Sequence, residues 1–126
     1  DCVAMAKQFA DRTHFVHLRS CYIFPNGNFT EASHLGGRGH LIELCRIFEK
    51  AEQEGKCNSG RRLPMRVDHG MTFTDEPGGV FDESNHGHNA GYTLLGRMFA
   101  MGQIQGVIAT VDDELGIEYK QPGFYD

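Results

Sequence analysis

Two short apolar runs, residues 13–18 and 63–67, constrain the fold of this chain more than any other feature. Each run has the composition of a β-strand and leads directly into charged residues. A stretch with helical periodicity, residues 40–54, separates the two runs, and further helices are predicted at residues 2–10 and 92–111. Strands that alternate with helices imply parallel strands joined by right-handed crossovers. The predicted fold class is therefore α/β.

The helix between the two strands is the best defined. Its apolar residues recur on one face, and a glycine is well placed to end it. The apolar residues are Leu41, Leu44, Cys45, Phe48 and Ala51, and the glycine is Gly55. The later helix offers its own apolar residues for packing, namely Leu95, Met98, Phe99, Gly102 and Ile108. We expect residues 112–126 to form an irregular tail.

Turn-forming residues predict two long loops. Pro-Asn-Gly-Asn at residues 25–28 and the glycine-rich residues 36–39 favour irregular structure, so the segment between them is predicted to be a loop. Residues 71–91 are rich in Gly, Asp and Asn and form a second predicted loop. A loop of about twenty residues is longer than compact domains usually carry without a functional reason.

Composition excludes several classes of partner. Seventeen acidic and twelve basic residues give the 126-residue chain a net charge of −5, which disfavours sequence-independent binding to nucleic acid. No run approaches the roughly 20 consecutive apolar residues of a membrane helix, and the N-terminus lacks the features of a signal peptide. The four cysteines form no CxxC pair and are expected to be reduced thiols. These features predict one cytoplasmic domain without a membrane or nucleic-acid partner, and they leave a homo-oligomer open.

The chemically informative residues follow the two predicted strands, and in parallel α/β folds such strand ends carry the functional site. His17 and Asp68 offer the imidazole and carboxylate preferred by Mn²⁺, Fe²⁺ or Zn²⁺. Arg19 and Arg66 could bind an acidic substrate, for which a carboxylate is the simplest match. His69 could carry a proton, since imidazole titrates near neutral pH.

Each of these residues also has a structural interpretation. A strand-end His or Asp often makes a hydrogen bond or caps a helix, and the two arginines could pair with local acids. Tyr92 could act as an acid or simply pack against a helix. His86 and His88 form a His-x-His pair, for which a solvated loop is the favoured interpretation. For each residue alone the structural interpretation is favoured, whereas for the residues of both strand ends taken together a functional site is favoured.

Four ordered segments together resemble the C-terminal third of mannonate dehydratase. They are FVHLRS at residues 15–20, NFTEASHLGG at 28–37, LPMRVDHG at 63–70 and AGYTLLGR at 90–97. The similarity spans nearly the whole chain, to about residue 111. Four motifs in order, several of them charged, are far more specific than a single motif.

The resemblance implies a TIM (β/α)₈ barrel that removes water from D-mannonate to give 2-keto-3-deoxy-D-gluconate, with a divalent metal such as Mn²⁺ or Fe²⁺. It implies roles for seven residues: His17 and Asp68 as metal ligands, His69 and Tyr92 as the acid and base, and Arg19, His34 and Arg66 as substrate-facing residues. The small-molecule partner implied is a sugar acid.

The family's remaining metal ligands, a Cys and a further His, belong to earlier strands that lie upstream of Asp1. A complete barrel needs about 250 residues, so this chain is predicted to supply only the closing β/α units. We expect open sheet edges, inactivity of the chain alone, and a requirement for the missing N-terminal barrel segment. Two alternatives stay open: a metal-dependent sugar isomerase-type barrel, and a non-catalytic truncated remnant.

Overall fold

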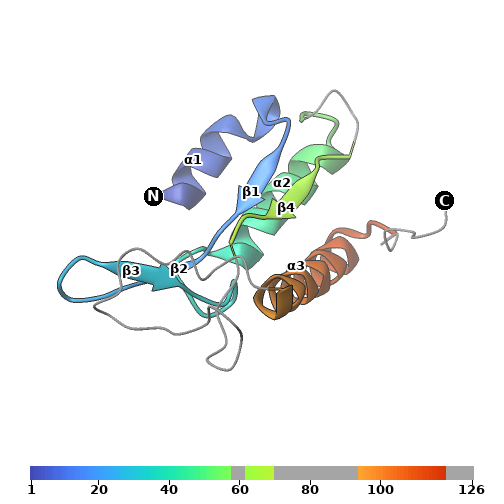
Figure 1. The fold of residues 1–126 in the computed structure, drawn as a ribbon. Coiled ribbons are helices and arrows are strands. Elements are labelled where there is room, and N and C mark those ends of the chain that lie inside the picture. Colours follow the sequence, from blue (N-terminus) through green and yellow to red (C-terminus); the bar gives the residue numbers. More distant parts are fainter. Residues whose placement is uncertain (58–61, 70–93, 119–126) are drawn as a thin grey trace.

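Two parallel strands form the centre of the structure. Strand β1 (Val16–Leu18) pairs with strand β4 (Met65–Val67), and His17 lies opposite Arg66 in the register. The structure is a computed structural model that describes residues 1–57, 62–69 and 94–118 (Figure 1). The parallel pair confirms the α/β class and both predicted strands.

Three helices accompany the strands: α1 (Cys2–Phe9), α2 (Leu41–Gln53) and α3 (Leu94–Leu115). A 3₁₀ turn, Ala10–Arg12, links α1 to β1. The Asp1 carboxylate accepts a hydrogen bond of 2.9 Å from the Val3 N–H and thereby caps α1. Gly55 follows α2 with a φ of 66°, the left-handed conformation that ends helices and that glycine adopts without strain.

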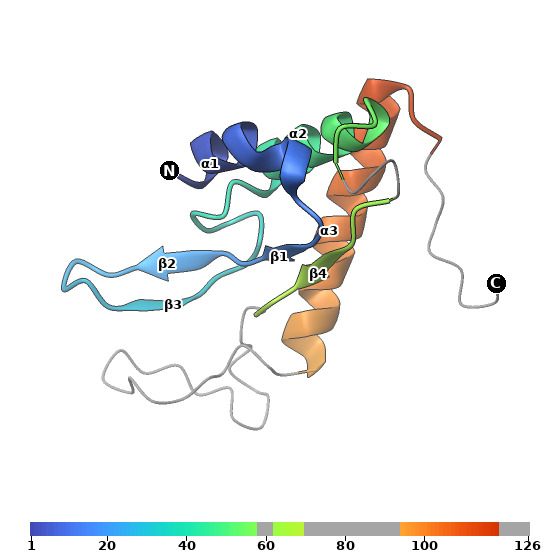
Figure 2. The same ribbon diagram turned by 90° about the horizontal axis from the view of Figure 1, so that it is seen from above.

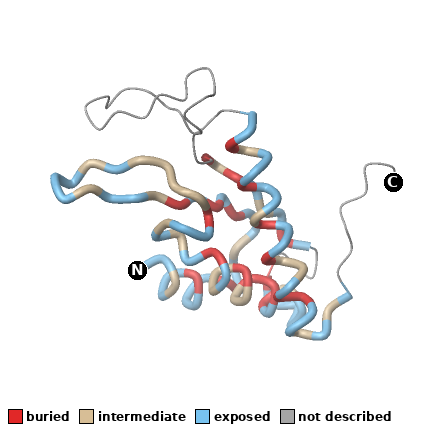
Figure 3. The backbone as a smooth tube through the Cα atoms, turned by 90° about the horizontal axis from the view of Figure 1, so that it is seen from below, coloured by how far each residue is buried: buried red, intermediate tan, exposed pale blue. Residues whose placement is uncertain are grey.

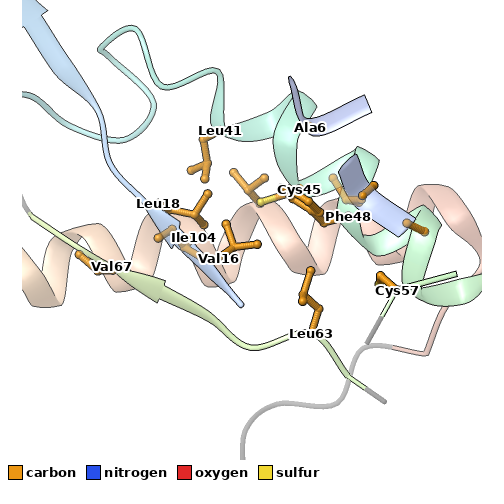
Figure 4. Close-up of a cluster of buried hydrophobic side chains, with 14 of the residues drawn as sticks. Ala6, Val16, Leu18, Leu41, Cys45, Phe48, Cys57, Leu63, Val67 and Ile104 are labelled. Atoms are coloured by element: carbon orange, nitrogen blue, oxygen red, sulfur yellow. The ribbon is translucent and has the colours of Figure 1, made fainter. Parts of the chain in front are cut away.

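The core lies between the strand pair and the helices (Figure 4). One face of the sheet contributes Val16, Leu18 and Val67, all buried. Their partners from the helices and the segment before β4 are Leu41, Cys45, Phe48, Leu63, Ile104, Val107 and Val111. Because side chains alternate along a strand, the same register turns His17 and Arg66 to the opposite face, where both are exposed.

The predicted loop over residues 25–39 is wrong in part, since the structure places a hairpin here. Strands β2 (Cys21–Ile23) and β3 (Phe29–Glu31) pair antiparallel and project from the end of β1 (Figure 2). Gly27, with a φ of 88°, and Asn26, whose Oδ1 accepts from the Asn28 N–H at 2.9 Å, form the connecting turn. The turn residues were recognised, but the flanking strands were too short to show a clear alternation.

Helix α3 differs from its prediction in two ways. It continues to Leu115, so the irregular tail does not begin at residue 112. Its buried residues are Gly96, Ala100, Ile104, Val107, Val111 and Asp112, whereas Leu95, Met98 and Phe99 are exposed. Buried and exposed positions alternate along this helix (Figure 3). Apolar residues surround much of this helix, so periodicity could not select the face that packs, and small residues at 96 and 100 let the helix approach its neighbours. The predicted loop at 71–91 lies outside the described residues.

By length and composition alone, α3 is also long and apolar enough to cross a bilayer. Its most apolar 18-residue window has a mean hydropathy of 1.2, and 28% of that window is buried inside the protein. A helix that packs on a core passes the same test, and the buried stripe of α3 contacts both α2 and β4. The helix is therefore weak evidence for a membrane.

Candidate functional site

The C-terminal ends of the two parallel strands bring His17 and Asp68 together. The Asp68 N–H donates to the Leu18 carbonyl at 3.1 Å, which extends the parallel pairing by one residue beyond β4. The Nδ1 atom of His17 then lies 3.6 Å from Oδ1 of Asp68, and both side chains are partly exposed. The structure therefore brings these two side chains close together.

His69, the residue after Asp68, connects this pair to the hairpin. Its Nε2 lies 3.8 Å from Oδ2 of Asp68, and its Nδ1 lies 3.4 Å from Oε1 of Glu31 at the end of β3. The side chains of His69 and Glu31 are each 10% exposed. An imidazole therefore sits between two carboxylates that come from different sheets.

Arg19 holds the Glu31 carboxylate in place. Its Nε donates to both carboxylate oxygens, at 3.0 and 3.2 Å, and its terminal nitrogen makes a further short contact to Oε1. The guanidinium also lies 5.3 Å from the centre of the Phe29 ring, a cation–π distance. The structural interpretation of Arg19, pairing with a local acid, is realised here, and its role toward substrate stays a prediction.

Glu31 is the residue that sequence reasoning missed. It lies inside the NFTEASHLGG motif. Because that segment is predicted to be a loop, the sequence does not indicate which of its side chains lie near the strand ends. Recognising the hairpin would have supplied the signal, because a hairpin after β1 returns residue 31 beside residue 21. The pairing of Cys21 with Glu31 carries the carboxylate back toward the site.

His34 is buried at 2% exposure and supports the end of β1. Its Nε2 is 2.9 Å from the Leu18 carbonyl, and its backbone N–H donates to Oε1 of Gln103 on α3, also at 2.9 Å. The structure thus places His34 behind the strand end. Its substrate-facing role stays a prediction, as does that of Arg66, whose exposed side chain shares a sheet face with His17. Tyr92 lies outside the described residues.

The donor set fits part of a divalent metal site. Two ligands about 2 Å from one ion typically stand about 3 to 3.5 Å apart, close to the separation of His17 and Asp68. Within residues 1–57, 62–69 and 94–118, no cluster of three or more His, Cys, Asp or Glu residues could hold a metal. His17 and Asp68 could therefore serve only as part of a ligand set.

A groove of about 380 Å³ runs beside the same sheet, between β4 and α3. All three residues of β4 line it, together with Met101, Ile104 and Ile108 of α3, and no residue of β1 does. Among the described strands, β4 pairs with β1 alone. The groove therefore follows the edge of β4 that β1 does not occupy.

A second charged cluster lies at the opposite, N-terminal end of β4. Arg62 is 3.8 Å from Oε2 of Glu49 on α2 and 3.7 Å from Oδ2 of Asp112 on α3. Both carboxylates are almost completely buried. Burial is the main cause that raises the pKa of Glu49 to about 7, and the charge of Asp112 adds to the shift.

The cysteines are free thiols, as predicted. Cys45 is fully buried in the core, and this burial raises the pKa of its thiol to about 12. A thiol with such a pKa is unreactive at neutral pH and acts as a small apolar side chain. Cys45 therefore contributes to the packing of the core and not to a reactive site.

Comparison with known proteins decides the family. The family model of D-mannonate dehydratase matches residues 1–117. The chain belongs to the mannonate dehydratase family. Similar proteins include mannonate dehydratase 2 of Agrobacterium fabrum, 37% identical over 117 residues, and mannonate dehydratase of Saccharophagus degradans, 34% identical over 114 residues. These alignments cover 91% and 89% of this chain but 28% and 27% of the two relatives. This member of the family thus spans about a quarter of the length of the relatives that it matches.

Proposed function

We propose that this chain supplies the closing β/α units of a (β/α)₈ barrel, corresponding to the C-terminal third of a mannonate dehydratase. The intact protein would remove water from D-mannonate to give 2-keto-3-deoxy-D-gluconate. The observation that carries the proposal is the approach of His17 to Asp68, 3.6 Å, at the C-terminal ends of neighbouring parallel strands. Active sites of TIM barrels are built at that end of the strands.

The surfaces that the chain leaves open support a barrel. Helices cover one face of the parallel pair, and the other face presents His17 and Arg66, as expected of strands that line a barrel interior. The groove beside β4 has the position that a further strand and its helix would fill. Exposed apolar side chains continue along α3 beyond the groove: Leu94, Leu95, Met98 and Phe99.

We propose that His17 and Asp68 hold a divalent cation, Mn²⁺ or Fe²⁺, together with ligands from outside this chain. Such a cation acts as a Lewis acid that stabilises the negative charge developing on the substrate carboxylate. The Asp68 carboxylate would compensate the charge of the ion, and the neutral His17 imidazole would donate a lone pair. The pairing of Asp68 with the backbone of Leu18 fixes the position of the carboxylate relative to the imidazole.

The dehydration requires a base and an acid. The base removes the proton next to the substrate carboxylate, and the acid donates a proton to the departing β-hydroxyl. We propose His69 as the base and Tyr92 as the acid. His69 adjoins Asp68 in sequence, and its Nε2 lies 3.8 Å from Oδ2 of Asp68, so the proposed base stands beside one of the two residues that would hold the cation. Arg19, His34 and Arg66 are proposed to bind or orient the sugar acid.

A chimera tests the proposal. Residues 1–117 would replace the segment of the Agrobacterium relative that they match, and the purified protein would be assayed with D-mannonate and Mn²⁺ for release of a 2-keto acid. We expect turnover by the chimera and none by this chain alone. A chimera that folds but isomerises a sugar without losing water would indicate the isomerase-type barrel. A folded chimera that binds no metal and performs neither reaction would indicate a non-catalytic remnant.

A further inference from the structure

The buried imidazole of His34 and the backbone of Asp68 share one hydrogen-bond acceptor, the carbonyl oxygen of Leu18. The Nε2 atom of His34 lies 2.9 Å from this oxygen, and the Asp68 N–H donates to it at 3.1 Å. A carbonyl oxygen has two lone pairs and no proton, so it can accept from both groups, and Nε2 must be the donor. The Leu18 carbonyl therefore connects His34 to the end of β4.

The proton on Nε2 leaves the other ring nitrogen with a lone pair. This Nδ1 atom is buried and has no hydrogen-bond partner among the residues that the structure describes. A proton on Nδ1 in place of Nε2 would break the bond to Leu18 and bury an N–H without an acceptor, which costs free energy. The surroundings thus favour the Nε2–H tautomer of His34.

The segment that carries His34 is held from two sides. The His34 N–H donates to Oε1 of Gln103 on α3 at 2.9 Å. On the other side, the Ala32 N–H donates to the Ser20 carbonyl at 2.9 Å, and the Gly39 N–H donates to Oγ of Ser20 at 3.2 Å. Because the imidazole is also 2% exposed, it has little freedom to move away from the strand end.

We propose that His34 is a positioning residue, which holds the Leu18 carbonyl in the orientation that accepts the Asp68 N–H and thereby fixes the Asp68 backbone. In this role His34 acts through Leu18 and touches no reacting atom. A carboxylate whose backbone is fixed loses less conformational entropy when it binds an ion. The consequence for metal binding rests on the proposed function, in which Asp68 is a ligand, whereas the contact at the strand end does not.

The tautomer of His34 tests the contact in the full chain without metal. ¹⁵N NMR distinguishes the two ring nitrogens, and at alkaline pH an imidazole is neutral. We expect the Nε2–H form. A His34 that is mainly the Nδ1–H form in the unmodified chain would overturn the proposal, whatever any variant does, because Nε2 could then not donate to Leu18.

Two substitutions separate positioning from packing. His34→Leu removes the donor at similar size, and amide hydrogen exchange at Asp68 should become about tenfold faster. Exchange at Val16, which bonds to the Pro64 carbonyl at the other end of β1, should change less than about twofold. His34→Gln supplies a side-chain N–H that can reach the same carbonyl, so it should restore most of the protection. Unchanged exchange at Asp68 in a folded His34→Leu variant, or equal acceleration at Asp68 and Val16, would contradict the proposal.

Mn²⁺ affinity of the chimera, measured by electron paramagnetic resonance, connects the contact to the proposed site. His34→Leu should weaken binding about tenfold, and His34→Gln should stay within about twofold of the unmodified chimera. Val107→Ala is the matched control, because it removes buried methyl groups of α3 and should lower stability without changing the affinity.

The outcomes keep this proposal apart from the proposed function. A chimera that turns over mannonate and has the same Mn²⁺ affinity with His34→Leu would reject His34 as the positioning residue and leave the function intact. An Nε2–H tautomer and an Asp68 amide that His34 protects, in a chain whose chimera is folded and binds no metal, would reject the metal site and leave the backbone contact in place.

Discussion

The two ends of strand β4 carry charged clusters of opposite character. At the C-terminal end, Asp68 and His17 are partly exposed and approach each other without a direct hydrogen bond. At the N-terminal end, Glu49 and Asp112 are almost completely buried and face Arg62. The first cluster is open to a ligand, whereas the second joins α2, α3 and the segment before β4.

The difference teaches which charges serve binding and which serve packing. Buried carboxylates lose the solvation of water, and only good pairing restores it, so the cluster at Glu49 depends on the fold around it. Partly exposed donors keep their solvation and can exchange water for a ligand. In barrels, the C-terminal end of the strands is associated with function and the N-terminal end with stability. The comparison predicts that substitutions at the two ends separate activity from stability.

The largest effect is expected at Asp68. In the chimera, Asp68→Asn should lower turnover by about a thousandfold or more, since several kcal/mol of charge stabilisation is lost. The free energy of unfolding should change by less than about 0.5 kcal/mol, because the side chain is partly exposed. Steady-state assays and urea unfolding measure the two quantities.

The control for Asp68 is Asp113→Asn, which removes a carboxylate from the exposed side of α3. It should change neither quantity. Equal loss of activity in the two variants would show that charge in general, rather than the strand end, supports turnover.

The next largest effect is a pH dependence of the free energy of unfolding, caused by the cluster at the N-terminal end of β4. The pKa of Glu49 is raised to about 7, so the folded chain favours the neutral carboxyl. This contribution is complete below the ordinary pKa of about 4.5 and is lost as the pH rises through about 7. The free energy of unfolding should fall by about 2 to 3 kcal/mol over that interval.

Substitution tests the assignment to Glu49. Glu49→Gln should flatten the pH dependence when urea unfolding is measured between these two pH values, and Glu114→Gln, on the exposed surface, should leave it in place. The same pH dependence in the unmodified chain and in Glu49→Gln would contradict the assignment to Glu49.

Part of the comparison was accessible from the sequence. The strand ends are predicted from the sequence, because His17 lies near the end of one β-prone run and Asp68 follows the other. The second cluster is not, because Glu49 looks like a solvent-facing residue of an amphipathic helix until α3 covers it. Glu31 was missed for a related reason, since the hairpin strands Cys21–Ile23 and Phe29–Glu31 are too short to give a pattern. Contacts between segments far apart in the sequence determine where such side chains lie, and a local sequence pattern does not indicate those contacts.

A smaller effect is expected where the segment after β3 passes close to the C-terminal end of β1. A Cβ atom on Gly37 would lie 2.8 Å from the Ala32 Cβ and would also collide with Ser20. Gly37→Ala should therefore destabilise the chain by about 1 to 3 kcal/mol. Gly102→Ala is the matched control, because nothing lies within 4 Å of its Cβ position. This control should stabilise α3 by up to about 1 kcal/mol, and thermal unfolding compares both variants.

The smallest effect concerns the start of α2. His40 has a φ of 50°, a left-handed conformation that non-glycine residues rarely adopt, and its side chain does not cap the helix. His40→Gly should raise the free energy of unfolding by about 0.5 to 1 kcal/mol. Lower stability in this variant would mean that the imidazole makes a contact worth more than the backbone strain.

Metal binding tests the central claim most directly, because His17 and Asp68 are proposed to share one cation at the C-terminal strand ends. Mn²⁺ titration of the chimera, followed by electron paramagnetic resonance, should show about one tightly bound ion per chain, and His17→Gln should weaken that binding at least about tenfold. Equal Mn²⁺ affinity in the chimera and in its His17→Gln variant would contradict the account.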